Sequence, residues 1–218
     1  MDRLRIAVEH TRGLTSGRSA TGLSHDDADD DVGSIATDSA CGFDPFPLLW
    51  ALHEAGARAV VIGQVAGIMH GSLELTGDLD LLWDGDPAKV EALTRAFGAV
   101  RCRLLDDDRE PVALGPRAFT LPKVQYESSS VSGDCCTPAL RWGSLPVRDF
   151  LARALATTGA DGLKVHYLRR EDLAAMRQAA GRAKDLRRNE ELERLCGSAS
   201  APRAMRREGH PVDHDHEM

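Results

Sequence analysis

Residues 76–82 read TGDLDLL and place two carboxylates, Asp78 and Asp80, inside an apolar run. Side chains alternate along a strand, so both aspartates would point to one face while Leu79 and Leu81 point to the other. Like charges on one partly buried face are costly unless a cation compensates them. Hard oxygen ligands in this arrangement suit Mg²⁺. The pattern therefore indicates a divalent metal site on a strand.

The sequence just before this strand indicates a phosphate-binding turn. Residues 60–71, VVIGQVAGIMHG, predict a strand, a glycine turn and the start of a helix. Gly63 allows a tight turn and close approach of a ligand to the backbone. Amides at the start of a helix can bind phosphate. A nucleoside triphosphate with Mg²⁺ requires both features, although the Walker A motif and the dinucleotide-binding fingerprint are absent.

Residues 60–82 resemble the nucleotidyltransferase superfamily that includes DNA polymerase beta. More narrowly, they resemble the AbiEii/AbiGii toxin-like nucleotidyltransferases. A second motif, AAGRAKDL at 179–186, is similar to the Gly-Arg-x-Lys-Asp-Leu helix start of that family, so the resemblance spans most of residues 45–195. The positions that match the front motif are Gly63, His70, Gly71, Thr76, Asp78 and Asp80.

The resemblance implies an α+β fold, with a small mixed or antiparallel sheet, flanking helices and additional C-terminal helices. It implies an Mg²⁺-dependent transfer of a nucleoside monophosphate from an NTP, with two Mg²⁺ ions. Asp78 and Asp80 would be catalytic metal ligands together with a third carboxylate from a neighbouring strand. The best candidate for the third ligand is Asp134, and Asp149, which we expect on a helix, is the alternative.

The resemblance also implies which residues bind the triphosphate: Gly63, Gln64, Thr76, Arg177, Arg182 and Lys184. Three positions depart from the family pattern. Gln64 stands where the family has Gly or Ser, Arg177 where relatives often have Lys, and Arg188 where relatives have a second Asp. Arg182 and Lys184 could instead form an ordinary ion-paired helix face with Asp185.

Several properties of the reaction stay open at this point. The acceptor could be an RNA such as tRNA, a protein side chain or a small molecule, and a toxin-like enzyme could have a cognate antitoxin. The alternative is a catalytically degenerate, nucleotide-binding or interaction module of the same fold. A stacking role for Trp142 against a base competes with ordinary packing. We expect His70 to be structural.

The composition is that of a globular chain without a membrane span. The 218 residues include 42% hydrophobic and 28% charged residues, with a formal net charge of −7. This acidic balance argues against general nucleic-acid binding. No apolar run approaches the ~20 residues that cross a bilayer, so we expect a cytoplasmic protein with no membrane partner. The five cysteines form no CxxC motif, and we expect reduced thiols near the core.

Patterning along the chain divides it into four parts. We expect a disordered extension at 1–43, a nucleotidyltransferase core at 44–145, a helical region at 146–197 and a disordered tail at 198–218. The expected helices are 44–56, 64–72, 86–98, 145–157 and 169–195, the last with a break near Gly181. The expected strands are 58–63, 78–83, 99–105, 118–129 and 130–136, with a short strand or extended link at 162–168.

Overall fold

The computed structural model describes residues 1–23 and 35–199 of the chain. Its helices are α1 (Asp2–Thr15), η2 (Asp38–Ala40), α2 (Phe46–Glu54), α3 (Gly63–Met69), η3 (Pro87–Lys89), α4 (Val90–Ala99), η4 (Ala118–Thr120), α5 (Val147–Ala152), α6 (Arg170–Ala180) and α7 (Ala183–Ala199). Its strands are β1 (Val60–Val61), β2 (Leu81–Leu82), β3 (Arg103–Leu105), β4 (Pro111–Val112), β5 (Lys123–Glu127), β6 (Ser132–Cys136), β7 (Leu155–Thr158) and β8 (Lys164–Tyr167).

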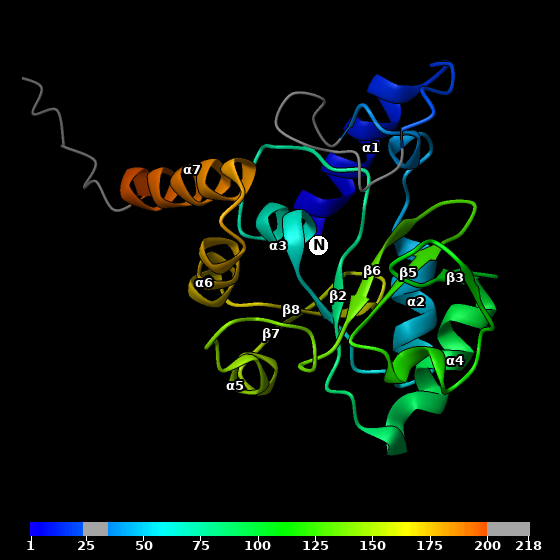
Figure 1. Ribbon diagram of the computed structural model, residues 1–218. Coiled ribbons are helices and arrows are strands. Elements are labelled where there is room, and N and C mark those ends of the chain that lie inside the picture. Colours follow the sequence, from blue (N-terminus) through cyan, green and yellow to red (C-terminus); the bar gives the residue numbers. More distant parts are fainter. Residues whose placement is uncertain (24–34, 200–218) are drawn as a thin grey trace, which may run out of the picture.

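The strands form one mixed sheet in the order β4-β3-β5-β6-β2-β1-β8-β7 (Figure 1). The pairs β2–β6 and β1–β8 are parallel, and the other neighbours are antiparallel. The predicted α+β class with a mixed sheet is therefore confirmed. The sheet is wider than the small one we expected, because it has eight strands.

One face of the sheet packs on a hydrophobic core beneath α2 and α4. The ring of Phe97 on α4 lies 5.0 Å from the rings of both Phe119 and Tyr126. The hydroxyl of buried Tyr126 donates to the carbonyl of Leu79, and both Leu79 and Leu81 are fully buried. The apolar residues around the two aspartates thus anchor this segment in the core.

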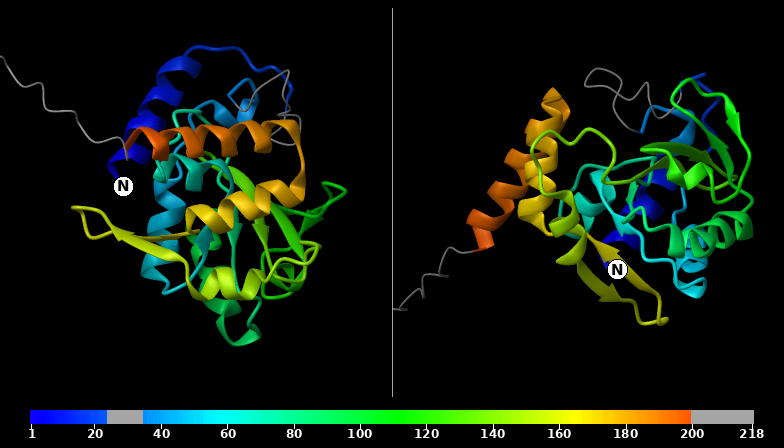
Figure 2. Two further views of the ribbon diagram at one scale, coloured as in Figure 1. Left: turned by 90° about the vertical axis from the view of Figure 1, so that its left-hand side faces the viewer. Right: turned by 60° about the horizontal axis from the view of Figure 1, so that its bottom comes forward.

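The opposite face is covered by α3, α6 and α7. Figure 2 shows α6 and α7 lying across this face as a helical hairpin. The predicted break between these helices is confirmed: Gly181 has a φ of +66° and caps α6 by donating its amide to the Arg177 carbonyl. This left-handed conformation favours glycine and turns the chain from α6 into α7.

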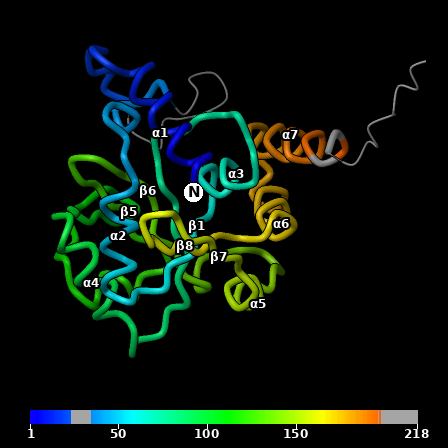
Figure 3. Tube along the Cα trace, turned by 180° about the vertical axis from the view of Figure 1, so that it is seen from behind, coloured from blue at the N-terminus to red at the C-terminus, as the bar shows by residue number. Residues whose placement is uncertain are grey.

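The N-terminal region differs from the disordered extension that we expected at 1–43. It forms α1, which packs beside α3 (Figure 3), and the short helix η2. Leu4, Val8, Thr11 and Thr15 are buried. Their helical spacing was a signal in the sequence that the low apolar content of the following residues obscured. Residues 24–34, and residues 200–218 of the expected tail, lie outside the described part of the chain.

The C-terminal region is also not purely helical. The helix expected at 145–157 ends at Ala152 in the structure, and Leu155–Thr158 forms β7, which pairs with β8. The link at 162–168 is a strand, because β8 runs parallel to β1 and completes the sheet. Tertiary pairing therefore overrides a helical pattern here. The division between a core at 44–145 and a helical region at 146–197 does not match this shared sheet.

Two further sequence expectations concern membranes and thiols. Within the part of the chain that the structure describes, no helix has both the length and the apolar character needed to cross a bilayer. Cys102, Cys135 and Cys136 are buried as free thiols, as expected for residues near the core.

Candidate functional site

A cavity of about 240 Å³ lies between the sheet and the α6–α7 hairpin. Its lining combines carboxylates from the sheet, cationic side chains and an apolar group. The polar and glycine residues that line it are Gly63, Gln64, Asp78, Asp80, Lys123, Asp134, Arg177, Arg182, Lys184, Asp185 and Arg188. The apolar residues include Leu140, Trp142, Leu173 and Met176.

Backbone pairing brings Asp80 and Asp134 together. Leu81 pairs with Cys135 in the parallel β2–β6 ladder, so the residues just before them lie side by side. The amide of Asp134 lies 3.3 Å from Asp80 Oδ1 and donates a hydrogen bond to it. Residues aligned in a parallel ladder share a face. The structure therefore places the third carboxylate predicted from the sequence next to the Asp-x-Asp pair.

Gly63 and Asp80 are in direct contact at the start of α3. Gly63 has a φ of +60°, and a Cβ built on it would lie 2.2 Å from Asp80 Oδ2. The Ile62 amide also donates to the Asp80 carbonyl at 2.9 Å. A side chain at position 63 would displace the carboxylate as well as strain the backbone. The glycine turn and the aspartate segment are thus parts of one site.

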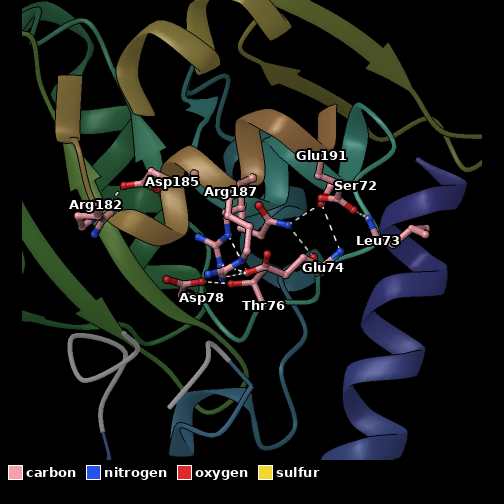
Figure 4. Close-up of polar contacts among 12 residues, drawn as sticks. Ser72, Leu73, Glu74, Thr76, Asp78, Arg182, Asp185, Arg187 and Glu191 are labelled. Carbon is pink, nitrogen blue, oxygen red and sulfur yellow. Dashed lines mark hydrogen bonds and ion pairs between the residues drawn. The ribbon is translucent and has the colours of Figure 1, made fainter. Parts of the chain in front are cut away.

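Thr76 differs from its predicted role in triphosphate binding. Its side chain is buried and is not part of the cavity lining. Its hydroxyl donates to Asp78 Oδ1, as Figure 4 shows. Thr76 therefore orients the Asp78 carboxylate from the buried side of the cavity wall, since both residues lie on the same side of the extended chain.

Gln64 turns its side chain into the protein. Its Nε2 donates to Ser72 Oγ at 2.9 Å and to the Glu74 carbonyl at 2.6 Å. Its Oε1 accepts from Arg177 Nη2 at 2.8 Å, and the same nitrogen lies 3.3 Å from the Gly63 carbonyl. The side chain that departs from the family pattern is thus accommodated in the interior, where it joins α3 to α6.

The helical wall of the cavity carries most of the positive charge. Arg188 on α7 is buried, and its Nε and Nη2 lie 2.8 and 2.7 Å from Glu74 Oε1. Arg182 stands exposed at the mouth, where its Nε donates to Asp185 Oδ2 at 2.6 Å (Figure 4). The ion pair between Arg182 and Asp185 that we considered from the sequence is therefore present, and Arg182 also lines the cavity.

These cations are crowded and partly removed from water. Burial, with a further contribution from the Arg188 charge, lowers the pKa of Arg177 to about 10. Burial and the neighbouring charges of Arg182 and Arg188 lower the pKa of Lys184. Each lowered pKa means that this site disfavours the charged form of the side chain. A bound polyanion would relieve this repulsion, so the wall is suited to phosphate.

Lys123 is a cavity residue that sequence reasoning missed. It lies on β5, and its Nζ is 3.8 Å from Asp134 Oδ2. The signal was the spacing of Lys123 and Gln125 on an alternating strand, but the facing strand and its register had to be known to use it. Arg188, which departs from the family motif, was not expected to bind the triphosphate, and the structure places it in the cavity lining.

Asp149 and His70 lie outside the cavity. Asp149 is exposed on α5, as expected. His70 Nε2 pairs with the Leu168 carbonyl at 2.8 Å, in agreement with a structural role. Cys136 lines the cavity, but burial raises the pKa of its thiol well above the ordinary value, so it remains protonated.

The carboxylates can be compared with what Mg²⁺ requires. Within the described residues, no group of three or more His, Cys, Asp and Glu side chains is arranged to hold a metal ion. Proteins commonly bind Mg²⁺ through one or two carboxylates, with substrate phosphates and water completing the octahedron. Asp78 and Asp80 both line the cavity, and the oxygen donors that they offer fit such an ion.

The chain matches no family model and no curated protein in the comparisons that were searched.

Proposed function

We propose that this protein is an Mg²⁺-dependent nucleotidyltransferase that moves a nucleoside monophosphate from an NTP to an acceptor hydroxyl. The observation that carries the proposal is the cavity itself. Carboxylates on the sheet, Asp78, Asp80 and Asp134, face a wall of cations on α6 and α7. A metal-bound triphosphate needs both halves, since the ion binds carboxylates and the remaining phosphate charge binds cations. The resemblance to the AbiEii/AbiGii-like nucleotidyltransferases supports the same reading.

The reaction forms a bond between the acceptor oxygen and the α-phosphorus of the NTP. The bond between that phosphorus and the oxygen leading to the β-phosphate breaks, and pyrophosphate leaves. The acceptor proton passes to a base, for which Asp134 is the candidate because it lies beside Asp80 in the cavity. When bound, Mg²⁺ would stabilise the charge that develops on the phosphate oxygens.

The chain's own residues divide the remaining tasks between the two walls. Asp78 and Asp80 would hold the ion, and Thr76 orients Asp78. Arg182, Lys184 and Arg188 would bind the β- and γ-phosphates as pyrophosphate charge builds up. Arg177 would act from beneath this wall, because Gln64 and the Gly63 carbonyl already hold one of its nitrogens. Gly63 would contribute indirectly, because its missing side chain leaves room for the Asp80 carboxylate.

The apolar side of the cavity is suited to the base of the nucleotide. Trp142 is held in place because its Nε1 donates to the Thr137 carbonyl at 2.9 Å. Leu140 lies near it in sequence, and Leu173 and Met176 line the cavity from α6. Stacking on an aromatic ring accepts any base.

The acceptor would be an RNA, a protein or a small molecule. A toxin-like enzyme of this kind would act in the cytoplasm with a cognate antitoxin.

Nucleotide binding is the first test. Each of the four α-³²P-labelled NTPs would be incubated with the protein, with Mg²⁺ or with EDTA, and binding would be measured by filter retention. We expect Mg²⁺-dependent binding that Asp78→Asn abolishes. Asp84→Asn is the matched control, because Asp84 follows the same strand but pairs with Lys89 outside the cavity. No binding of any NTP by the wild-type protein would refute the proposal.

A second candidate is the nucleotide-binding module without transfer activity. The observation that favours it is the Arg177–Gln64 pair, because relatives have Lys and a small residue at these positions, and here both are occupied with each other. Label transfer separates the two candidates. The binding experiment would be repeated with total tRNA, the protein itself and small hydroxylated acceptors. Covalent label on any of them supports the enzyme, whereas Mg²⁺-dependent binding without label or pyrophosphate release supports the module.

A further inference from the structure

Side-chain hydrogen bonds lead from α7 to the buried Arg177 through the segment that follows α3. The carboxylate of Glu191 on α7 accepts from the Leu73 amide at 2.9 Å and from the Ser72 hydroxyl (Figure 4). Ser72 Oγ accepts from Gln64 Nε2 at 2.9 Å, and Gln64 Oε1 accepts from Arg177 Nη2 at 2.8 Å. We call the series Glu191–Ser72–Gln64–Arg177 the relay. It joins α7 to α3 and α3 to α6.

The relay allows a single arrangement of its hydrogen atoms. An ionised carboxylate can only accept, so the one hydroxyl hydrogen of Ser72 goes to Glu191. Ser72 Oγ then accepts from its other neighbours, Gln64 Nε2 and the Glu74 amide at 3.3 Å. The second hydrogen of Gln64 Nε2 goes to the Glu74 carbonyl at 2.6 Å. Gln64 therefore turns its oxygen toward Arg177, where it accepts from the guanidinium.

Arg177 is held by one of its terminal nitrogens. Nη2 donates to Gln64 Oε1 and lies 3.3 Å from the Gly63 carbonyl, and a Cβ built on Gly67 would lie 2.7 Å from it. Nη1 is buried and has no hydrogen-bond partner among the residues that the structure describes. A buried donor without an acceptor is costly. Because Arg177 lines the cavity, Nη1 is suited to an oxygen of a ligand bound there.

Glu191 also acts on Arg177 through its charge. Burial, together with the Arg188 charge, lowers the pKa of Arg177 to about 10, and nearby carboxylates that include Glu191 oppose this shift. Glu191 itself is not part of the cavity lining. Its effect on a ligand would therefore pass through Arg177.

We propose that Glu191 is a positioning residue for the triphosphate: through Ser72 and Gln64 it fixes the Arg177 guanidinium so that Nη1 donates to a β- or γ-phosphate oxygen. This inference rests on the proposed function and deepens it, because it assigns part of the phosphate binding to a residue outside the cavity. Arg177 is the group that touches the nucleotide in this scheme, and Glu191 sets its place.

The test is a double-variant cycle on nucleotide affinity. Dissociation constants for each of the four α-³²P-labelled NTPs would be measured by filter retention, with Mg²⁺ and without an added acceptor. Glu191→Gln offers one oxygen in place of two, so the Leu73 amide and the Ser72 hydroxyl no longer each have an acceptor. We expect it to weaken binding of the preferred NTP by about 10-fold. In an Arg177→Met background the same substitution should change the affinity by less than about 2-fold, because the residue through which Glu191 acts is gone.

Glu193→Gln is the matched control. Glu193 lies exposed on the same helix and outside the relay, so this substitution removes the same charge from α7. It should leave the affinity within about 2-fold of the wild type. Ser72→Ala removes the middle of the relay and keeps the Glu191 charge, and we expect it to weaken binding by about 10-fold as well.

Ser72→Ala also keeps the cycle complete if another variant does not fold by circular dichroism. It takes the place of Glu191→Gln in the Arg177→Met background, or the place of Arg177→Met in combination with Glu191→Gln. In either pair the double variant should lose no more affinity than the weaker-binding single variant.

The outcomes separate this inference from the function on which it rests. Wild-type affinity in folded Glu191→Gln or Arg177→Met would overturn the role of Glu191 and leave the nucleotidyltransferase proposal standing. A 10-fold loss that persists in the Arg177→Met background, or that Glu193→Gln reproduces, would do the same. If the wild-type protein binds none of the four NTPs, both proposals fall.

Discussion

The two walls of the cavity are held in place by different forces. On the sheet wall, backbone hydrogen bonds set the positions: the Leu79 amide donates to the Ser132 carbonyl at 2.9 Å, and the Ile62 amide donates to the Asp80 carbonyl at 2.9 Å. On the helical wall, side chains do the holding, through Arg177 with Gln64 and Arg188 with Glu74. The acidic half is therefore preset by the ladder, while the basic half depends on individual side-chain contacts.

We expect the largest difference between the two walls in the loss of kcat/KM that a substitution in each wall causes. Asp80→Asn keeps the shape of the residue but removes the charge that holds the ion, and we expect a loss of at least about 100-fold in kcat/KM. Arg182→Gln removes one exposed cation among several, and we expect a loss of about 10-fold, mainly in KM. Steady-state release of pyrophosphate measures both. Equal losses would show that the two walls contribute alike.

Gly63 tests the rigidity of the sheet wall. Gly63→Ala places a non-glycine residue at a φ of +60° and a Cβ 2.2 Å from Asp80 Oδ2. The matched control is Gly181→Ala, which has a similar φ of +66° but meets only the Gln178 carbonyl at 3.9 Å. The conformation alone costs about 1–2 kcal/mol in either variant.

We therefore expect Gly181→Ala to lower the free energy of unfolding by about 1–2 kcal/mol and Gly63→Ala to lower it by clearly more. Urea denaturation followed by circular dichroism measures both values. Equal losses would mean that the Asp80 side chain moves aside without cost, so that the sheet wall is less rigid than the ladder suggests.

Gln64 tests the helical wall in the same way. Gln64→Leu leaves the buried Arg177 without its side-chain acceptor, and a buried polar group that loses its partner costs about 1–3 kcal/mol. Gln178→Leu is the control, since Gln178 is exposed on the same helix, α6. Thermal and urea unfolding would both report the difference. A Gln64→Leu variant as stable as Gln178→Leu would show that the pair does not secure α6.

The same contrast explains how much the sequence predicted. The acidic pair, Gly63 and their order along the chain are local patterns. The family resemblance implied a third carboxylate, and Asp134 was the candidate because it lies in the short strand expected at 130–136. The side-chain role of Gln64 and the placement of Lys123 depend on pairs 113 and 11 residues apart that only the folded chain brings together. Local periodicity carries no information about such partners unless the register is known. For the same reason, β7 was read as the end of a helix, because its partner β8 decides its conformation.

We expect the smallest effect, a change in the pH dependence of stability, from His70, which lies where the two walls meet. It caps α3 on the sheet side, and its Nε2 lies 2.8 Å from the carbonyl of Leu168, which leads into α6. Burial lowers the pKa of His70 in the folded protein. As the pH falls below about 6.5, the His70 imidazole takes up a proton more readily in the unfolded chain than in the folded one, so the folded state loses stability.

We expect His70→Gln to weaken the decline in unfolding free energy between pH 7 and pH 5, measured by urea denaturation at each pH. The decline should not vanish, because burial also lowers the pKa of His166. An unchanged slope would show that the folded protein does not disfavour the protonated form of His70, so that burial at this junction does not shift its pKa.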